Sequence, residues 1–414
     1  MCDSGLRVSS WRASCRRGRR QQADSMDLNT IQQALREERL DGWLFFDHHR
    51  RDPLAYRILG LPEGGTVSRR WYYVIPAEGE PRALVHRIES GVLASVPGRR
   101  IIYSSWSSQI EGLAALLAGC RTVAMQYSAR CAVPYISMVD AGTVELVASL
   151  GIDVRSSQNL VQIFEARWSD RQLEMHLEAG RRVDAVLRHA FDHIRERLAR
   201  GDAFDEWSVA QFVRRGFAAE GLVTDHGPIV GVNGNASNPH YEPSPQNSTP
   251  VRAGDCILID LWAKLDDPDA VFYDITWTGY CGTTPPGAVQ NVFEIVTGAR
   301  DAAVQRVEQA VEEGRPLHGF EVDDAARGHI RKCGFADYFV HRTGHSIGRD
   351  VHGSGANMDN LETHDDRRVI AGTCFSVEPG IYLPDFGIRS EVNVYVGDGR
   401  TMVTGEIQRK LVLL

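Results

Sequence analysis

Four acidic residues in the C-terminal half of the chain lie in runs of Val, Ile, Leu, Phe and Tyr that are typical of buried β-strands. They are Asp260, Asp274, Glu378 and Glu391. A carboxylate buried in such a strand costs several kcal/mol unless it is paired or bound to a metal ion. The fold therefore has to bring these four segments to groups that neutralise their charge.

The two glutamate segments are predicted to pair as one antiparallel hairpin. The apolar arms 380–382 and 387–389 flank a turn-prone tetrad, and the hairpin is expected to be centred between Pro384 and Asp385. Positions 378 and 391, both Glu, then lie opposite each other. Opposed residues have Cβ atoms about 4.5–5.5 Å apart, a separation at which two like charges repel.

The two aspartate segments predict a second hairpin of the same kind. Strands are expected over 255–262 and 271–277, and a hairpin centred on Asp267 places Asp260 opposite Asp274. A multivalent cation is the simplest remedy for two facing pairs of carboxylates. The strand-like run that starts at Val340 adds an imidazole, His345. Four carboxylates and one imidazole suit two divalent cations, Mn²⁺ or also Zn²⁺, Co²⁺ or Fe²⁺.

In this order and these settings, the five residues resemble the pita-bread metallopeptidases, the family that includes prolidase, aminopeptidase P and methionine aminopeptidase. The settings are Ile-Asp-Leu, Tyr-Asp-Ile-Thr, Thr-Gly-His-Ser-Ile-Gly, Val-Glu-Pro-Gly-Ile-Tyr and Gly-Ile-Arg-Ser-Glu. The resemblance covers roughly residues 165–414. It implies a centre with two divalent metal ions, Mn first and Co or Zn as alternatives, and a homodimer that acts on small peptides.

The resemblance also implies the reaction and its residues. A metal-bridging hydroxide hydrolyses the peptide bond before proline in X-Pro dipeptides or short peptides. Glu378 acts as proton shuttle, and His240 and His352 are further catalytic residues. The expected metal ligands are Asp260, Asp274, His345, Glu378 and Glu391.

Four residues are expected to bind substrate: His240, His341, His352 and Arg389. The trio His240, His352 and Arg389 resembles the X-Pro-specific branch more than methionine aminopeptidase. Trp277 departs from the family, because prolidases usually have Arg at this position, and it leaves the substrate preference open. Three alternatives remain: aminopeptidase P-like removal of the N-terminal residue from longer X-Pro peptides, creatinase-like C–N hydrolysis, and a non-catalytic binding domain.

The composition is ordinary for a soluble globular protein, with 43% hydrophobic and 24% charged residues among 414. A net charge of −8 gives no reason to expect nucleic acid or an anionic membrane as partner, and no apolar run is long enough to span a bilayer. The eight cysteines are scattered without C-x-x-C spacing, as is typical of reduced thiols in a cytoplasmic protein.

The hydrophobic pattern divides the chain into three parts. Residues 1–25 are Arg-rich and are expected to be a disordered extension, and residues 26–165 alternate short strands with helices. A capping-box pattern at 169–172 begins a long helix that reaches about Arg200. The expected fold class is α/β (α+β), with an N-terminal creatinase/prolidase-like domain over 26–165 and a pita-bread catalytic domain over 166–414.

Overall fold

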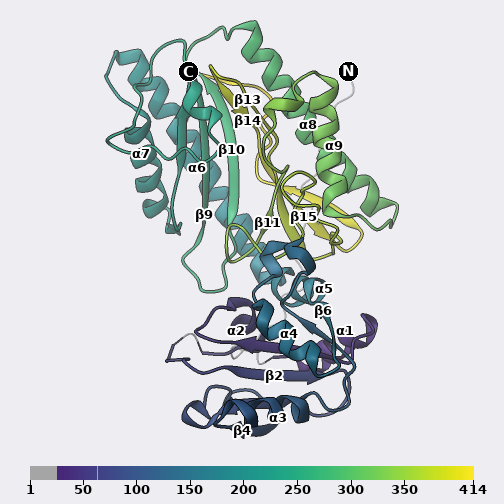
Figure 1. Cartoon of the computed structure of the whole chain (residues 1–414). Helices are drawn as coiled ribbons and strands as arrows, with labels where there is room; N and C mark the ends of the chain where they lie inside the picture. The colour runs from purple at the N-terminus through teal and green to yellow at the C-terminus, as the bar shows by residue number, and fades with distance from the viewer. Residues whose placement is uncertain (1–25, 63) are drawn as a thin grey trace, which may run out of the picture.

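The computed structural model describes residues 26–62 and 64–414, so the extension predicted over 1–25 lies outside the described residues. Figure 1 shows two groups of sheets and helices stacked end to end. We call residues 26–166 the N-terminal region, which lies at the bottom of the view. Residues 167–414 are the C-terminal region, in teal, green and yellow above it.

The N-terminal region is built on one six-stranded sheet with the strand order β4-β3-β2-β1-β5-β6. Antiparallel pairing joins β1 to β2 and β2 to β3, whereas β3–β4, β1–β5 and β5–β6 are parallel. The strands are β1 (Gly42–Asp47), β2 (Trp71–Pro76), β3 (Arg82–His86), β4 (Arg99–Tyr103), β5 (Thr122–Met125) and β6 (Asp153–Ser156).

Helices cover both faces of this sheet. Because side chains alternate along a strand, Trp43 and Phe45 of β1 pack in one core and Leu44 and Phe46 in another. The helices are α1 (Leu28–Glu37), α2 (Pro53–Leu59), α3 (Trp106–Leu116), α4 (Ala141–Ser149) and α5 (Gln158–Val161). Residues 134–136, which start at Pro134, form a separate 3-10 turn before α4.

The first half of the C-terminal region packs two helices on a sheet. Helix α6 (Asp170–Arg200) starts with the predicted capping box, in which Ser169 and Gln172 exchange hydrogen bonds, and ends at Gly201 with a positive φ of 70°. Helices α6 and α7 (Glu206–Ala219) share a core with the sheet strands. These strands are β7 (Leu222–Val223), β8 (Ile229–Val232), β9 (Cys256–Leu265), β10 (Tyr273–Tyr280) and β17 (Val412–Leu413).

The second half repeats this arrangement with different elements. Helices α8 (Gly287–Glu312) and α9 (Gly319–Lys332) share a core with the strands between residues 373 and 397. The sheet order is β11-β12-β15-β16, and β13 pairs with β14 as a separate ribbon. The strands are β11 (Ser346–Ile347), β12 (Thr373–Val377), β13 (Gly380–Tyr382), β14 (Gly387–Arg389), β15 (Val392–Gly397) and β16 (Arg400–Thr404).

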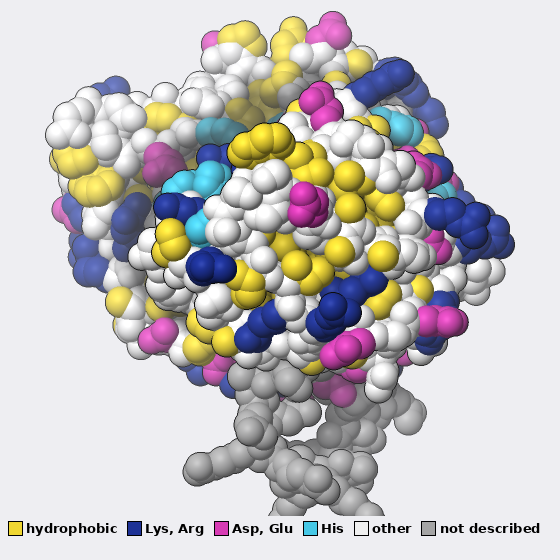
Figure 2. Space-filling view, turned by 60° about the horizontal axis from the view of Figure 1, so that its bottom comes forward, with side chains coloured by type: hydrophobic (Ala, Val, Ile, Leu, Met, Phe, Trp, Pro, Cys, Tyr) yellow, Lys and Arg dark blue, Asp and Glu magenta, His cyan; other side chains and the backbone are white. Residues whose placement is uncertain are grey.

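On the face that Figure 2 shows, the Lys and Arg side chains of the described residues do not gather in one continuous basic patch. Basic, acidic and hydrophobic side chains are interspersed over the part of this face that Figure 2 colours by type. Within residues 26–62 and 64–414, no helix combines the length and the apolar character that crossing a membrane requires.

Candidate metal centre

The aspartate hairpin forms, but its register differs from the prediction. Asp274 of β10 pairs with Trp262, and Asp260 of β9 pairs with Thr276, so the ladder is shifted by two residues. The reason lies in the turn, where the amide of Phe272 donates to Gly348 O at 2.9 Å instead of joining β9. A shift of two residues keeps each side chain on its original face, so the two carboxylates lie diagonally on one side of the sheet.

The glutamate hairpin has the predicted register. Ile381 pairs with Ile388 in the β13–β14 ribbon, and Val377 pairs with Val392 where β12 meets β15. Glu378 and Glu391 therefore occupy opposed positions. They lie in the gap between these two ladders, however, and not inside strands as the apolar runs predicted.

Backbone hydrogen bonds of the two glutamates explain this gap. The Glu391 amide donates to Thr276 O of β10 at 3.1 Å, and the Glu378 amide donates to Thr343 O at 2.7 Å. Each glutamate is thus tied to a neighbouring segment that carries another predicted ligand. The run from Val340 is likewise not a long strand, since only Ser346 and Ile347 are extended in β11.

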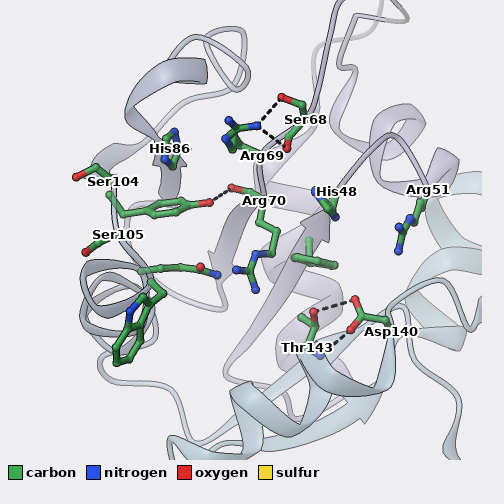
Figure 3. Close-up of a pocket in the computed structure, with 14 residues that line it drawn as sticks. His48, Arg51, Ser68, Arg69, Arg70, His86, Ser104, Ser105, Asp140 and Thr143 are labelled. Atoms are coloured by element: carbon green, nitrogen blue, oxygen red, sulfur yellow. Dashed lines mark hydrogen bonds between the residues drawn. The ribbon is translucent and has the colours of Figure 1, made fainter.

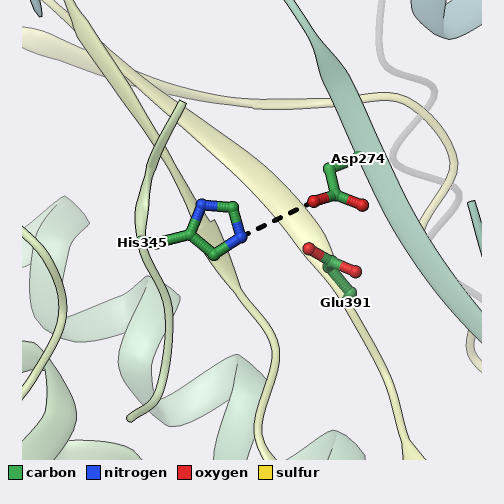
Figure 4. Close-up of side chains that lie close together, drawn as sticks. All are labelled: Asp274, His345 and Glu391. Carbon is green, nitrogen blue, oxygen red and sulfur yellow. Dashed lines mark ion pairs between the residues drawn. The ribbon is translucent and has the colours of Figure 1, made fainter. Parts of the chain in front are cut away.

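Close backbone packing brings His345 to the same point. A Cβ added at Gly344 would lie 1.9 Å from Ser376 O, so only glycine allows this segment to approach β12. The His345 amide donates to Ser376 Oγ at 2.9 Å, which fixes the start of the histidine side chain. One oxygen or nitrogen atom from each of Asp274, His345 and Glu391 lies within 4.8 Å of the other two. Figure 4 shows these three side chains close together.

The protonation of His345 leaves a lone pair directed at the carboxylates. Its Nδ1 lies 3.2 Å from Ser346 O, a carbonyl that only accepts, so Nδ1 carries the proton. Burial lowers the pKa of His345, which keeps the ring neutral. Its Nε2 then faces Asp274 Oδ2 at 3.5 Å and Glu378 Oε1 at 3.3 Å. Three electron-rich atoms at these distances fit a cation that they would all bind.

Two carboxylate oxygens support the same interpretation. Asp274 Oδ1 and Glu391 Oε1 are buried and have no hydrogen-bond partner among the described residues. Burial, followed by the charge of a neighbouring acid, raises the pKa of both groups well above the ordinary value. These residues therefore fit divalent metal ions, which would neutralise them and satisfy the unpaired oxygens.

Asp260 has a partner of a different kind. Arg389 Nη2 donates to Asp260 Oδ2 at 2.6 Å, and the pKa of this buried carboxyl is raised to about 6 by burial, against the opposing charge of Arg389. The other nitrogens of Arg389 are also occupied, because Nε donates to Thr276 Oγ1 and Nη1 to Tyr382 Oη. Arg389 is 2% exposed, and its guanidinium links the side chains of Asp260, Thr276 and Tyr382 inside the protein.

All the predicted substrate-binding residues line one cavity of about 720 Å³. Asp260, Asp274, His345 and Glu378 also line it, whereas Glu391 is next to Asp274 and His345 but is not a lining residue. The ring of His352 stands edge-on to His345, with centroids 4.3 Å apart. His341 donates from Nδ1 to Arg342 O and accepts at Nε2 from Tyr382 Oη, both at 2.6 Å, because burial and the charge of Arg389 lower its pKa to about 3.

Three supporting residues were not predicted. Thr276 donates to Glu391 Oε2 at 2.8 Å, Ser376 donates to Glu378 Oε1 at 3.0 Å, and Tyr382 links His341 to Arg389. Two of them stand two residues from a predicted ligand, so the period-two alternation of a strand is the signal that could have found them. The same alternation places Trp277 on the opposite face of β10, against the core of α6 and α7, and not beside the ligands.

A second hollow of about 480 Å³ lies in the N-terminal region (Figure 3). His48 lines it together with Arg51 and Arg70. Asp140 is the one carboxylate among the lining residues, and both its oxygens accept hydrogen bonds from Thr143. Among the residues that the structure describes, the group that could hold a metal ion is Asp274, His345 and Glu391 in the C-terminal region.

Comparisons with known proteins agree with this geometry. The family model described as Metallopeptidase family M24 matches residues 174–398. The Xaa-Pro dipeptidase of Lactobacillus helveticus is 29% identical over 245 residues, which cover 59% of this chain and 60% of that protein. The probable dipeptidase PepE of Mycobacterium tuberculosis is 27% identical over 367 residues, 87% of this chain and 89% of the relative.

The fold has solved counterparts over nearly its whole length. The crystal structure of dipeptidase PepE from Mycobacterium ulcerans superposes with a TM-score of 0.69 at 24% identity, covering 93% of this chain and 96% of that one. At this identity the likeness concerns the fold. It confirms the predicted class, an N-terminal prolidase-like α/β domain followed by a pita-bread domain.

Proposed function

The chain belongs to metallopeptidase family M24, and we propose that it hydrolyses the peptide bond before proline in X-Pro dipeptides. The observation that carries this proposal is the convergence of His345 Nε2 on Asp274 Oδ2 and Glu378 Oε1, at 3.5 and 3.3 Å. The similarity to the Xaa-Pro dipeptidase of Lactobacillus helveticus supports the choice of substrate.

The proposed ligands of two divalent ions are Asp260, Asp274, His345, Glu378 and Glu391. When bound, such ions polarise the scissile carbonyl and lower the pKa of water toward neutrality. The Arg389 guanidinium keeps Asp260 in place through the 2.6 Å hydrogen bond, and Thr276 orients Glu391. The binding geometry is thus largely formed by the chain itself.

The proton transfers are assigned to Glu378. Its carboxylate is half-buried at the wall of the cavity, where Ser376 Oγ holds Oε1 and leaves Oε2 toward Arg389 Nε at 3.8 Å. Glu378 takes a proton from the attacking water and delivers it to the proline nitrogen as the C–N bond breaks. His240 and His352, on the wall of the same cavity, are positioned to hold the substrate carbonyl.

The test is hydrolysis of Ala-Pro by protein stripped with a chelator and then reloaded with Mn²⁺, Co²⁺ or Zn²⁺. We expect no activity without metal and recovery with at least one of these ions. Glu378→Gln should abolish the activity, whereas Glu242→Gln, a carboxylate in the same cavity outside the ligand set, should retain it. Full activity in Glu378→Gln would contradict the proton-shuttle role, and no hydrolysis with any ion would contradict the function.

Longer X-Pro peptides are the second candidate substrates, because the cavity of about 720 Å³ exceeds the volume of a dipeptide. Creatinase-like C–N hydrolysis and a non-catalytic binding role are less well supported, since Asp274, His345 and Glu391 form a possible metal-binding group and Asp260 and Glu378 line the adjoining cavity. Three finer proposals follow from the resemblance to prolidases: Mn²⁺ as the native ion, a homodimer, and a cytoplasmic location.

A further inference from the structure

The hollow of about 480 Å³ in the N-terminal region carries an excess of positive charge, although the chain as a whole has a net charge of −8. We call it the N-terminal hollow. Its described lining includes Arg51, Arg69 and Arg70, two histidines and a single carboxylate, that of Asp140. Both oxygens of Asp140 accept from Thr143, so this acid caps α4. The cationic side chains of the hollow are therefore not balanced by its own acid.

Two of the three arginines have no partner for their charge. Among residues 26–62 and 64–414, the guanidinium groups of Arg51 and Arg70 form no hydrogen bond and no ion pair. Arg69 differs, because its Nη1 donates to the carbonyl and the hydroxyl oxygens of Ser68. A guanidinium has five N–H groups in a planar fork, which match the oxygens of a carboxylate or a phosphate. Arg51 and Arg70 thus keep this capacity for a ligand.

Nearby acids fix the backbone that carries the two arginines. The Arg51 amide donates to Asp47 Oδ1 at 2.7 Å, and Asp47 is 1% exposed. Glu89 accepts from the amides of residues 68 and 69, both at 3.0 Å, directly before Arg70. Within the described part of the chain, neither acid forms an ion pair with Arg51 or Arg70. The two side chains therefore project from fixed segments with their charge unpaired.

Arg51 and Arg70 act on the same point of the hollow. Burial lowers the pKa of His48, and the charges of His49, Arg51 and Arg70 lower it further. Figure 3 shows Arg70 extending into the middle of the lining residues, with His48 and Arg51 on one side of it. A ring that two guanidinium groups keep neutral lies in a positive potential, which a bound anion would neutralise.

The rest of the lining gives the hollow its shape. Gln109 is 2% exposed, and its Nε2 donates to the buried Tyr72 hydroxyl at 2.7 Å. Tyr103 donates from its hydroxyl to Arg70 O, also at 2.7 Å. In contrast, Trp106 is 75% exposed and offers the face of its ring at the edge of the hollow. A small ligand would thus meet a preformed polar floor and an aromatic rim.

We propose that the N-terminal hollow binds a phosphate-bearing small molecule through the guanidinium groups of Arg51 and Arg70. A phosphate monoester carries a charge of about −1.5 to −2 and three acceptor oxygens, so it can pair with both groups at once. A single carboxylate has one charge and would leave one guanidinium unpaired. The volume of about 480 Å³ is within the usual range of small-molecule sites.

This inference is independent of the proposed function. Among the described residues, the N-terminal hollow and the cavity of the metal centre share no lining residue. The phosphate group can come from the free ion or from a nucleotide whose base stacks on Trp106. Both sources use the same two arginines, and the experiment distinguishes them.

The experiment is titration calorimetry of the full chain with inorganic phosphate, adenosine monophosphate and adenosine at low ionic strength. Metal ions also bind phosphate, so each titration is repeated after a chelator has removed bound metal, and the hollow accounts for the binding that persists. We expect dissociation constants below about 1 mM for phosphate and for adenosine monophosphate. Adenosine, which has no phosphate, should bind at least about tenfold more weakly.

Variants assign the binding to the hollow. Arg51→Gln and Arg70→Gln should each weaken the binding of adenosine monophosphate about tenfold, the effect of one charge-assisted hydrogen bond. Arg99→Gln is the matched control, because Arg99 is exposed on β4 of the same sheet but does not line the hollow. It should leave the affinity within a factor of about two. All three side chains are exposed, and thermal unfolding without ligand checks that each variant is folded.

Trp106→Ala separates the two sources of the phosphate group. A fall in affinity for adenosine monophosphate to that for inorganic phosphate identifies a nucleotide-like ligand, and an unchanged affinity identifies the phosphate group alone. Either result supports the proposal if the two arginine variants weaken binding.

Four results would overturn the proposal. Neither phosphate compound binds the metal-free chain, adenosine binds as tightly as its monophosphate, or Arg51→Gln and Arg70→Gln bind like the starting protein. The fourth is an equal loss in Arg99→Gln and Arg70→Gln, because attraction to the overall charge of the region predicts that result.

Discussion

Two buried polar clusters in the C-terminal region differ in how their charges are satisfied. Asp365 and Arg367 are 0% and 1% exposed, and the arginine donates to both carboxylate oxygens, from Nε at 2.9 Å and from Nη2 at 2.6 Å. The Asn357 amide and Ser354 O complete the hydrogen bonds of this pair. Asp274 and Glu391 are buried to a similar degree, yet each keeps an oxygen without a partner.

The difference separates structural charges from charges kept for a ligand. A buried pair that satisfies itself stabilises one conformation and has no capacity left. A buried carboxylate with an unmade bond raises the free energy of the folded state, and the protein retains that cost only if a ligand removes it. Substitutions in the two clusters should therefore act on different properties of the protein.

We call Asp274 and Glu391, which keep oxygens without partners, the open cluster, and Asp365 with Arg367 the closed cluster. The largest effect on activity is expected at the open cluster. Asp274→Asn should lower kcat/KM for an X-Pro dipeptide by about 10⁴-fold, because several kcal/mol of charge stabilisation depend on the metal ligands. The metal-free variant should be no less stable than the starting protein, since burial raises the pKa of Asp274 and its charge is costly at neutral pH. Urea unfolding in a chelator measures the stability, and a clear loss there would contradict this view of the cluster.

The closed cluster should behave in the opposite way. Arg367→Met leaves the Asp365 carboxylate buried without its main partner and should destabilise the fold by about 3–5 kcal/mol. Neither residue lines the cavity, so the fraction that remains folded should keep its kcat/KM. A stably folded Arg367→Met protein that loses as much kcat/KM as Asp274→Asn would contradict the distinction between the two clusters.

A smaller effect is expected from His176, a second closed site. Its Nδ1 donates to Phe272 O and its Nε2 accepts from Thr404 Oγ1, both at 2.7 Å, and burial lowers its pKa from 6.5 to about 4. Between about pH 4 and pH 6.5, the unfolded chain therefore binds a proton at His176 and the folded protein does not. The stability that His176 contributes is complete above pH 6.5 and falls as the pH drops, by about 2 kcal/mol at pH 5.

The measurement for His176 is the change in unfolding free energy between pH 7 and pH 5, compared with His176→Gln. The variant has no titrating group at this position and should show a slope about 2 kcal/mol smaller over that interval. If the unfolding free energies of the two proteins changed equally between pH 7 and pH 5, the pKa of His176 would not differ between the folded and unfolded states, and this prediction would be wrong.

Much of the centre followed from the sequence because local patterns carried it. The tetrad 383–386 defined the turn, and with it the opposed positions of Glu378 and Glu391. The capping box at Ser169 marked the start of α6 to the residue. Such features depend on neighbours along the chain, whose geometry the residue types already restrict.

Other features depended on contacts between distant segments. The register of the aspartate hairpin differs from the prediction because the Phe272 amide donates to Gly348 O. Glu378 lies outside the strands because its amide donates to Thr343 O. The hydrogen bond from Arg342 to Tyr135 joins residues 207 apart in the sequence, and the one from Arg389 to Asp260 joins residues 129 apart. The sequence alone determined which side chains need a cation, since burial in apolar strands shows in composition. The tertiary structure decided which of those charges have partners, because a hydrogen bond depends on where two segments meet.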